Sequence, residues 1–192
     1  LNPSDTTLGN LMYENNVTII QFVPTLLFGL LQNGFAIDQL PSLRMLFCGG
    51  ESLELDAAWA DKQSFKIINL YGPTEATIDI TSCVYCKSIG DKGGVVPIGK
   101  PVANNAVYVL DANLNAVPIG AIGMLYVGGA SLGRGYLNKP QLTQERFIKN
   151  PFCNNAEQYI YKTGDLVRWL TDGNLEYIGR NDFQVKVRGF RI

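Results

Sequence analysis

The chain has 192 residues, of which 46% are hydrophobic, and a formal net charge of −1. This length suits one large domain or two small ones, and the mixed charges give no electrostatic case for binding nucleic acid. No apolar run reaches transmembrane length, and the start at Leu1-Asn2-Pro3 lacks the basic region of a signal peptide. We therefore expect neither a nucleic-acid partner nor a membrane partner, and we expect the chain to be a segment of a longer protein.

Helical and strand patterns alternate over the first 70 residues. Apolar spacing predicts helices at residues 4–16, 24–34 and 55–63. The second helix is expected to begin at Pro24, because proline is favoured in the first turn. Runs rich in β-branched and apolar residues predict strands at residues 17–22, 43–48 and 65–70. This alternation predicts an α/β fold with a mostly parallel sheet. Ligands bind beyond the carboxyl ends of such strands. Two of the predicted strands end near Gly49-Gly50 and Gly72-Pro73, so we predict one shared ligand crevice there.

The pattern changes from about Pro97. Short strands separated by turns are predicted at residues 107–110, 123–128, 166–170 and 174–178, with a hairpin turn at 171–173. Short helical pieces are predicted near residues 131–136 and 142–147. This half is therefore expected to form a small antiparallel β-sheet or barrel. We place the boundary near Lys100-Pro101, which gives an α/β part at residues 1–100 and a β-rich subdomain at residues 101–181.

Two of the four cysteines, Cys83 and Cys86, form a C-x₂-C pair within a strand-like run from Thr77 to Cys86. Neither a second pair nor any histidine completes a zinc site. We expect these cysteines to pack in the protein rather than to bind metal. Thiols also suit a reducing compartment, so a cytoplasmic protein is expected.

The stretch Asn69-Leu70-Tyr71-Gly72-Pro73-Thr74-Glu75 runs from the third predicted strand into a sharp break at Gly-Pro. It presents an aromatic ring, a hydroxyl and a carboxylate close together, which suits a nucleotide bound with its metal. Tyr71 can stack on a base, Thr74 can donate to a phosphate oxygen, and Glu75 can hold Mg²⁺, which prefers oxygen ligands. The alternative is an ordinary polar turn after a strand.

A second candidate carboxylate, Asp165, follows Thr163-Gly164, which we interpret as a turn. A carboxylate accepts two hydrogen bonds strongly, which suits the paired hydroxyls of a ribose; the alternative is an aspartate that caps its own turn. Tyr177 lies on the next strand and is expected to pack against the same nucleoside. Arg180 can contact ribose or phosphate oxygens, or it can be a solvated surface charge.

Four motifs occur in order along the chain, at residues 69–75, 123–138, 161–166 and 179–192. Together they resemble the adenylation domains of nonribosomal peptide synthetases. These domains belong to the adenylate-forming superfamily, with acyl-CoA synthetases and luciferases. The resemblance covers nearly the whole chain, and the Gly-Pro-Thr-Glu and Arg-Gly-Tyr-Leu-Asn forms are more similar to peptide synthetases than to acyl-CoA synthetases.

The resemblance implies that a carboxylic acid, an amino acid or a relative of one, is activated with ATP and Mg²⁺ to an acyl-AMP. The acyl group would then pass to the phosphopantetheine thiol of a carrier-protein domain, and a small accessory protein is a further expected partner. By resemblance Asn69 and the backbone around Gly50 meet the adenine edge, and Tyr71 stacks on the adenine. Thr74 and Glu75 are the implied catalytic residues, Thr74 at the α-phosphate and Glu75 at the Mg²⁺. Asp165 is the implied ribose ligand.

By position, five residues match the family's pocket for the acid side chain: Phe47, Gly49, Leu70, Ile78 and Asp79. Gly49 is expected to leave room there. A buried carboxylate needs a partner, so we hypothesise that Asp79 hydrogen-bonds a polar group of a small substrate, for example a serine-like acid. The alternative, weighted equally, is that Asp79 is a satisfied surface residue.

The resemblance also implies a hinge at Asp182, about which a C-terminal lobe starting at residues 182–192 would swing between two states. The family's phosphate loop, its α-amine-binding aspartate and its C-terminal catalytic lysine are not found in this sequence. We therefore expect the segment to be inactive alone. Two alternatives stay open: an acyl-CoA or aryl-acid ligase of the same superfamily, and a degenerate domain that only binds nucleotide or serves as a scaffold.

Overall fold

A computed structural model describes residues 6–90, 94–153, 159–181, 186–187 and 190–191. The chain divides into two compact units. The first comprises residues 1–70, 83–96 and 185–192, and the second comprises residues 71–82 and 97–184. Residues 71–82, which include the Gly-Pro-Thr-Glu stretch, thus fold within the second unit.

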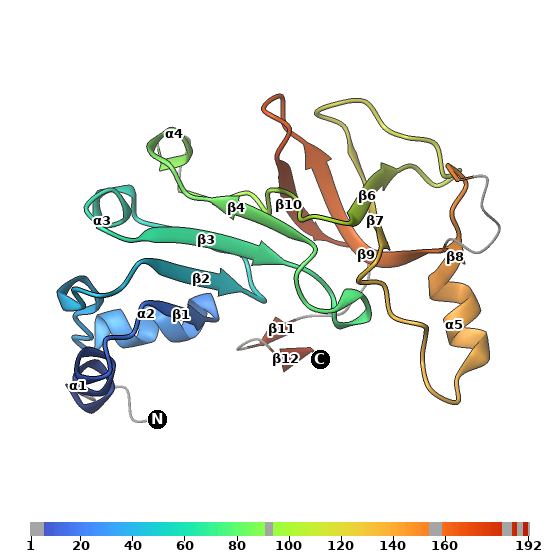
Figure 1. Cartoon of the computed structure of the whole chain (residues 1–192). Coiled ribbons are helices and arrows are strands. Elements are labelled where there is room, and N and C mark those ends of the chain that lie inside the picture. The colour runs from blue at the N-terminus through green and yellow to red at the C-terminus, as the bar shows by residue number, and fades with distance from the viewer. Residues whose placement is uncertain (1–5, 91–93, 154–158, 182–185, 188–189, 192) are drawn as a thin grey trace. The chain divides into compact units, whose positions relative to one another are not determined.

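The first unit is a parallel sheet flanked by helices (Figure 1). Strand β2 pairs in parallel with β1 on one side and with β3 on the other. This arrangement confirms the predicted α/β fold with a mostly parallel sheet. In chain order its elements are α1 (Thr6–Glu14), β1 (Ile19–Phe22), α2 (Pro24–Gln32), the 3₁₀ turn η1 (Ile37–Gln39), β2 (Met45–Gly49), α3 (Ala57–Ala60), β3 (Lys66–Tyr71), β4 (Thr81–Val84) and α4 (Lys87–Gly90).

Helix α2 covers the sheet of the first unit. Its buried side chains, Leu27 and Leu30, join one apolar cluster with Ile20, Leu46 and Ile67 of the strands. The helix begins at Pro24, as predicted, because proline lacks only an N–H that the first turn would leave unbonded. Each fully buried aliphatic side chain of this kind stabilises the fold by about 1.5–3 kcal/mol.

Helix α3 is shorter than the predicted helix at residues 55–63. It begins after Asp56, whose carboxylate accepts from the backbone N–H of Trp59 at 2.8 Å. The two residues before Asp56 pair with a distant segment. The Leu55 N–H donates to the Gly94 carbonyl at 2.9 Å, and Glu54 forms an isolated antiparallel β-bridge with Val95. This pairing with a distant segment prevents the helix from starting earlier.

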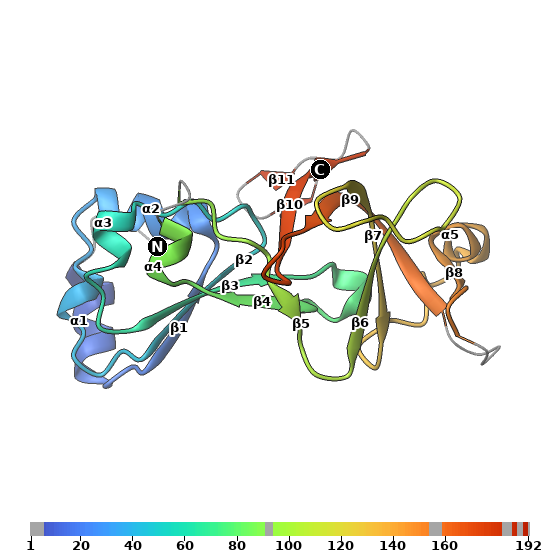
Figure 2. The same cartoon turned by 90° about the horizontal axis from the view of Figure 1, so that it is seen from above.

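The second unit is an antiparallel sheet with strand order β10-β9-β7-β6, and β8 pairs with β9. Figures 1 and 2 both show β7 lying between β6 and β9. The predicted small antiparallel sheet is therefore confirmed. In chain order its elements are the 3₁₀ turn η2 (Thr74–Ala76), β5 (Lys100–Pro101), β6 (Asn105–Leu110), β7 (Ile122–Gly129), α5 (Pro140–Arg146), β8 (Phe147–Lys149), β9 (Tyr159–Trp169) and β10 (Leu175–Arg180).

The hairpin between β9 and β10 forms as predicted. The Leu170 N–H donates to the Asn174 carbonyl at 2.8 Å, and Gly173 adopts a φ of 80°, which glycine tolerates without strain. Beyond this sheet, the short strands β11 (Lys186–Val187) and β12 (Phe190–Arg191) pair antiparallel with each other.

Three local predictions for residues 77–165 are wrong. Residues 131–136 form an irregular loop rather than a helix, because Gly135 has a φ of 127°, outside the helical region, and the Gly133 N–H bonds to the Glu75 carbonyl. The strand expected from residue 77 starts only at Thr81, since Thr77 and Ile78 have positive φ angles of 56° and 72°.

The third wrong prediction concerns Thr163-Gly164, which lies inside strand β9 rather than in a turn. Gly164 adopts a φ of 83°, and the register of β9 against β7 shifts in this region. These features mark a β-bulge, which locally redirects side chains of the strand. Asp165 is therefore presented by a bulged strand.

Within the part of the chain that the structure describes, no helix is long and apolar enough to cross a membrane. Cys83 is buried in the core of the first unit, as the predicted packing role requires. Cys86 is exposed, so the packing prediction is wrong for that residue. Its Sγ lies 3.2 Å from the hydroxyl of Ser88.

Candidate functional site

The loop that follows strand β3 folds back on itself at Gly72. The Ile80 N–H donates to the Tyr71 carbonyl at 2.8 Å, which closes the loop. A Cβ on Gly72 would lie 2.1 Å from the Ile78 carbonyl oxygen, so only glycine fits there. The closed loop thus holds Tyr71 and the turn η2, with Thr74 and Glu75, at one end of the second unit.

The structure brings together three of the predicted site residues, Tyr71, Asp165 and Arg180. The Tyr71 hydroxyl donates a short hydrogen bond to Oδ2 of Asp165. Arg180 donates from Nη1 to Oδ1 of the same carboxylate at 2.8 Å, and from Nη2 to the Thr163 carbonyl at 3.3 Å. Each oxygen of Asp165 therefore already accepts one hydrogen bond within the protein.

This cluster is largely shielded from water. The side chains of Arg180 and Asp165 are 12% and 10% exposed. Burial raises the pKa of Tyr71 well above its ordinary value, and the neighbouring Asp165 carboxylate raises it further. Tyr71 therefore stays a neutral hydrogen-bond donor at physiological pH. A buried, oriented carboxylate of this kind is a strong hydrogen-bond acceptor.

Tyr177 packs against the same apolar cluster as Tyr71, on strand β10. Asn69 lies in the first unit, where it is only 2% exposed. Its side-chain amide donates to the Val96 carbonyl at 3.0 Å, so this group helps to hold the local backbone. Gly50 directly follows β2, is exposed, and has a φ of 88°. The adenine contacts of Asn69 and Gly50 stay predictions.

Glu75 is held by the irregular loop between β7 and α5. The Tyr136 hydroxyl donates to Oε1 of Glu75 at 2.6 Å, and the Gly133 N–H donates to the Glu75 carbonyl at 2.7 Å. Thr74, next to it in the chain, is exposed. The predicted catalytic pair thus consists of one partly buried, hydrogen-bonded carboxylate and one solvent-exposed residue.

A Mg²⁺ ion fits this donor set only together with a nucleotide. Among the residues described, no group of three or more His, Cys, Asp or Glu side chains could hold a metal ion alone. Mg²⁺ is commonly bound by one or two carboxylates plus the phosphates of the substrate. A single carboxylate at Glu75 suits that mode of binding, and the oxygen ligand suits a hard cation.

The predicted acid-pocket residues fall in both units. Gly49 and Leu70 are neighbours in the β2–β3 register, and Phe47 lies two residues earlier on β2. A Cβ on Gly49 would lie 3.1 Å from the Leu70 carbonyl oxygen, so Gly49 permits close strand packing at this point.

Ile78 and Asp79 belong to the second unit. Ile78 is 62% exposed with a φ of 72°, an unfavourable conformation for a β-branched residue. Such strain often accompanies functional loops. Desolvation raises the pKa of Asp79 above its ordinary 3.8, because the side chain is partly buried. The predicted hinge, Asp182, lies outside the described residues.

The sequence alone did not single out Tyr136 or Thr77. Tyr136 contacts Glu75, and the Thr77 hydroxyl donates to the Ser131 carbonyl at 2.7 Å, so both join the Glu75 loop to the β7–α5 loop. The signal for Tyr136 was present in the Arg-Gly-Tyr-Leu-Asn motif. No local pattern shows that a tyrosine 61 residues away reaches Glu75.

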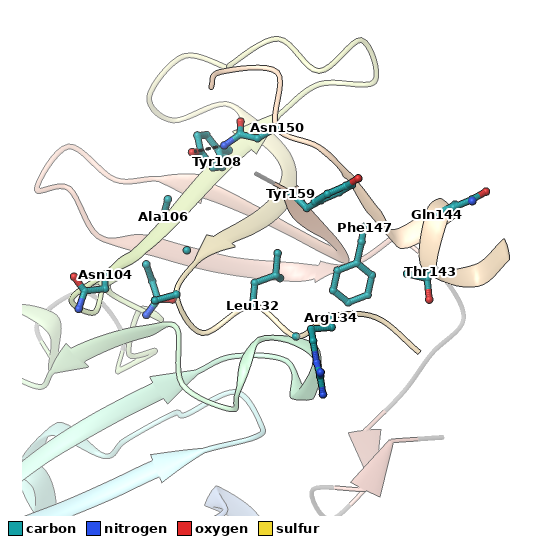
Figure 3. Close-up of a pocket in the computed structure, with 14 residues that line it drawn as sticks. Asn104, Ala106, Tyr108, Leu132, Arg134, Thr143, Gln144, Phe147, Asn150 and Tyr159 are labelled. Carbon is teal, nitrogen blue, oxygen red and sulfur yellow. Dashed lines mark hydrogen bonds between the residues drawn. The ribbon is translucent and has the colours of Figure 1, made fainter. Parts of the chain in front are cut away.

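A separate cavity of about 990 Å³ lies in the second unit. Its walls come from β6, the β7–α5 loop, α5, β8 and the start of β9, and none of the predicted site residues lines it. Figure 3 shows Leu132 and Phe147 lining this cavity and the guanidinium of Arg134 pointing away from them. The cavity is therefore distinct from the Tyr71–Asp165–Arg180 cluster, and the β7–α5 loop that lines the cavity also holds Glu75.

A family model described as "AMP-binding enzyme" matches residues 2–137. Malpinin synthetase of Mortierella alpina is 45% identical over 186 residues, which cover 96% of this chain and 2% of that protein. Bacitracin synthase 3 of Bacillus licheniformis is 44% identical over 187 residues, covering 96% of this chain and 3% of that protein. The chain thus spans only a few per cent of the length of these relatives.

Solved structures match over nearly the whole chain. Holo-PA1221, an NRPS protein with adenylation and PCP domains bound to a vinylsulfonamide inhibitor, has a TM-score of 0.87 and 30% identity. The match covers 100% of this chain and 33% of that one. The Vibrio cholerae adenylation domain AlmE, in complex with glycyl-adenosine-5′-phosphate, has a TM-score of 0.82 and 32% identity, covering 96% of this chain and 35% of that one.

Proposed function

This chain belongs to the AMP-binding enzyme family, and from that membership we propose that it is part of an adenylation domain that activates an amino acid, or a related carboxylic acid, with ATP. In this reaction a carboxylate oxygen of the acid attacks the α-phosphorus of ATP. The bond from the α-phosphorus to the bridging oxygen breaks, pyrophosphate leaves, and an acyl-AMP mixed anhydride forms. The synthetase relatives and the adenylation-domain structures support this proposal.

The Tyr71–Asp165–Arg180 cluster is the observation that carries the proposal. Its carboxylate is buried and oriented from both sides, and carboxylates accept hydrogen bonds strongly, which suits the two hydroxyls of a ribose. We assign the ribose to Asp165 and the adenine face to the Tyr71 ring. Tyr177 packs on the same nucleoside, and Arg180 contacts ribose or phosphate oxygens while it holds Asp165 in place.

At the reacting end, we assign Thr74 to an α-phosphate oxygen and Glu75 to the metal. The bound Mg²⁺ would neutralise charge that develops on the phosphate oxygens. Glu75 supplies its carboxylate from a loop fixed by hydrogen bonds, whereas Thr74 is exposed and accessible to a phosphate. Asn69 and the backbone at Gly50 are proposed to meet the adenine edge.

We propose an amino acid as the leading substrate class, with Phe47, Gly49, Leu70, Ile78 and Asp79 shaping the side-chain pocket. The AlmE neighbour, solved with glycyl-adenosine-5′-phosphate, supports this class. We further propose that the acyl group passes to a phosphopantetheine thiol on a carrier domain. The neighbour that contains adenylation and PCP domains supports that acceptor. Because this chain covers about a third of such proteins, we expect it to supply part of the site rather than to react alone.

The test is acid-dependent exchange of labelled pyrophosphate into ATP by the polypeptide that contains this chain. A panel of amino, hydroxy and keto acids would be assayed with the wild type and with Asp165→Ala. Exchange with one acid, lost in the variant, is the expected result. A folded protein that binds ATP but exchanges with no acid would instead be a nucleotide-binding scaffold. Transfer of the activated acid to free CoA rather than to a carrier thiol would mean an acyl-CoA ligase.

A further inference from the structure

The side chain of Glu75 has a specific donor, the hydroxyl of Tyr136. The Tyr136 oxygen lies 2.6 Å from Oε1 of Glu75, and the Tyr161 hydroxyl lies 3.3 Å from the Tyr136 oxygen. A hydrogen bond to an ionised carboxylate is shorter and about twice as strong as a neutral one. Burial raises the pKa of Tyr136 well above its ordinary value, and the hydrogen bond to Glu75 raises this pKa further. The geometry thus makes Tyr136 a hydrogen-bond donor to Oε1 of Glu75.

The backbone around Glu75 is fixed to the same loop. The Gly133 N–H donates to the Glu75 carbonyl at 2.7 Å, and the Thr77 hydroxyl donates to the Ser131 carbonyl at 2.7 Å. A Cβ on Gly133 would lie 2.9 Å from the Glu75 carbonyl oxygen, so the loop can approach only because this residue is glycine. Both the backbone and the side chain of Glu75 are thus held by one segment, residues 131–136.

Tyr136 is itself held in place by helix α5 and strand β8. Its backbone N–H donates to the Thr143 hydroxyl at 2.9 Å. Its ring packs edge-to-face on Phe147, with centroids 5.7 Å apart and an interplanar angle of 77°. Figure 3 shows Thr143 and Phe147 on the elements that follow this loop. The backbone, the ring and the hydroxyl of Tyr136 therefore each have a contact that fixes their position.

We propose that Tyr136 is a positioning residue for Glu75, holding its carboxylate in the orientation that binds the metal; this inference rests on the proposed role of Glu75 in the function above. Mg²⁺ demands near-ideal octahedral geometry, so a carboxylate free to rotate is a poorer ligand than an oriented one. Hydrogen-bond partners of metal ligands typically contribute about 10- to 100-fold in metal affinity. Tyr136 acts through Glu75 and is not itself assigned a contact with substrate.

The test uses Mn²⁺ as a paramagnetic probe, bound to the polypeptide that contains this chain together with an ATP analogue that cannot be cleaved between the α- and β-phosphates. Electron paramagnetic resonance of unbound Mn²⁺ gives the Kd without any catalytic turnover. Four proteins are compared: wild type, Tyr136→Phe, Glu75→Ala and the double variant. Such a cycle isolates the coupling between the two residues. Tyr126→Phe, which changes another buried tyrosine of the same unit, is the matched control.

We expect Tyr136→Phe to raise the Kd for Mn²⁺ by about 10-fold or more, and to have no further effect once Glu75 is alanine. Tyr126→Phe should leave the Kd unchanged. If Tyr136→Phe fails to fold, Thr143→Val replaces it. This change removes the acceptor of the Tyr136 N–H but keeps the Tyr136 hydroxyl. The Kd for Mn²⁺ is then expected to rise several-fold.

Three results would overturn the inference. An unchanged Kd in Tyr136→Phe, with a raised Kd in Glu75→Ala, would leave the proposed function intact and remove the positioning role. Equal effects of Tyr136→Phe with and without Glu75 would mean that Tyr136 acts only on the fold. An unchanged Kd in Glu75→Ala would remove the metal assignment, and pyrophosphate exchange would then decide separately whether the adenylation function stands.

Discussion

The hydroxyl of Tyr71 donates to Oδ2 of Asp165, a residue 94 positions further along the chain. Arg180 donates to the other oxygen of the same carboxylate. Tyr71 is the last residue of β3, Asp165 comes from the bulged strand β9, and Arg180 is the last residue of β10. The orientation of Asp165 is thus fixed before any ligand binds, which lowers the entropy that binding must overcome.

The ring and the hydroxyl of Tyr71 are expected to contribute differently to nucleotide binding. Tyr71→Ala removes the stacking surface, which contributes about 1–3 kcal/mol per base, so ATP affinity should fall by about 5- to 150-fold. Tyr71→Phe keeps the ring and removes only the bond to Asp165, so it should retain most of the affinity. Isothermal titration calorimetry with ATP measures both. Equal losses in the two variants would mean that the hydroxyl, not the ring, supports binding.

Two ion pairs on the β9–β10 ladder offer a matched test of burial. Arg180–Asp165 is 12% and 10% exposed, whereas Arg168–Glu176 is 40% and 26% exposed. Arg180→Ala leaves a buried carboxylate without its cation and should lower the free energy of unfolding by about 3–5 kcal/mol. Arg168→Ala should lower it by less than about 1 kcal/mol. Urea denaturation gives both values, and similar losses would contradict the account of the buried pair.

The glycine at position 133 is predicted to be intolerant of substitution. Gly133→Ala would place a Cβ 2.9 Å from the Glu75 carbonyl oxygen, so the loop must shift. Such overpacking typically lowers stability by about 1–3 kcal/mol. Gly29→Ala, in helix α2 with no atom within 4 Å of the new Cβ, should instead stabilise the protein by about 0.5–1 kcal/mol. Chemical denaturation compares them, and a neutral Gly133→Ala would show that the loop does not depend on this close approach.

The stability effect of Asp79 should depend on pH. Desolvation raises the pKa of Asp79 above its ordinary 3.8. At a pH between the unfolded-state and folded-state pKa values, the folded protein therefore holds a proton that the unfolded chain has released. Its contribution to stability therefore falls as the pH rises from about 4 through the folded-state pKa. Asp79→Asn stays neutral and should raise the Tm at pH 7, by an amount that shrinks as the pH approaches 4. Thermal unfolding from pH 4 to 8 measures this difference.

The control for Asp79 is Asp38→Asn, which changes an exposed aspartate and should hardly alter the Tm. A Tm difference for Asp79→Asn that stays constant from pH 4 to 8 would show that its effect is not electrostatic. Specificity is a separate readout for the same variant: an unchanged acid preference in pyrophosphate exchange would remove Asp79 from the proposed substrate pocket.

Elements with strong local signals were predictable from the sequence. Helix α2 begins at Pro24, as expected, and the turn at residues 171–173 forms the predicted hairpin. The parallel and antiparallel sheets also follow from local patterns, because periodicity and turn residues are set by short stretches of chain. Three of the residues singled out for the nucleotide, Tyr71, Asp165 and Arg180, do lie in one cluster.

Features that depend on distant partners were not predictable. Helix α3 is shortened because Leu55 bonds to Gly94, 39 residues later, and nothing near residue 55 signals this contact. Thr163-Gly164 has the composition of a turn, yet the neighbouring strand β7 incorporates it into β9 as a bulge. The role of Tyr136 was not predictable for the same reason, since it follows from the contact with Glu75 rather than from neighbouring residues in the sequence.

The most direct measurement is the affinity of the protein for ATP compared with 2′,3′-dideoxy-ATP, in the wild type and in Asp165→Ala. If Asp165 accepts hydrogen bonds from the ribose, the wild type should prefer ATP by about 10- to 100-fold, since a hydrogen bond to a charged group contributes about 1.5–3 kcal/mol. Asp165→Ala should bind both nucleotides equally and more weakly. A wild type that binds the two nucleotides with the same affinity, or a variant that keeps the preference, would contradict the assignment of this cluster to the nucleoside.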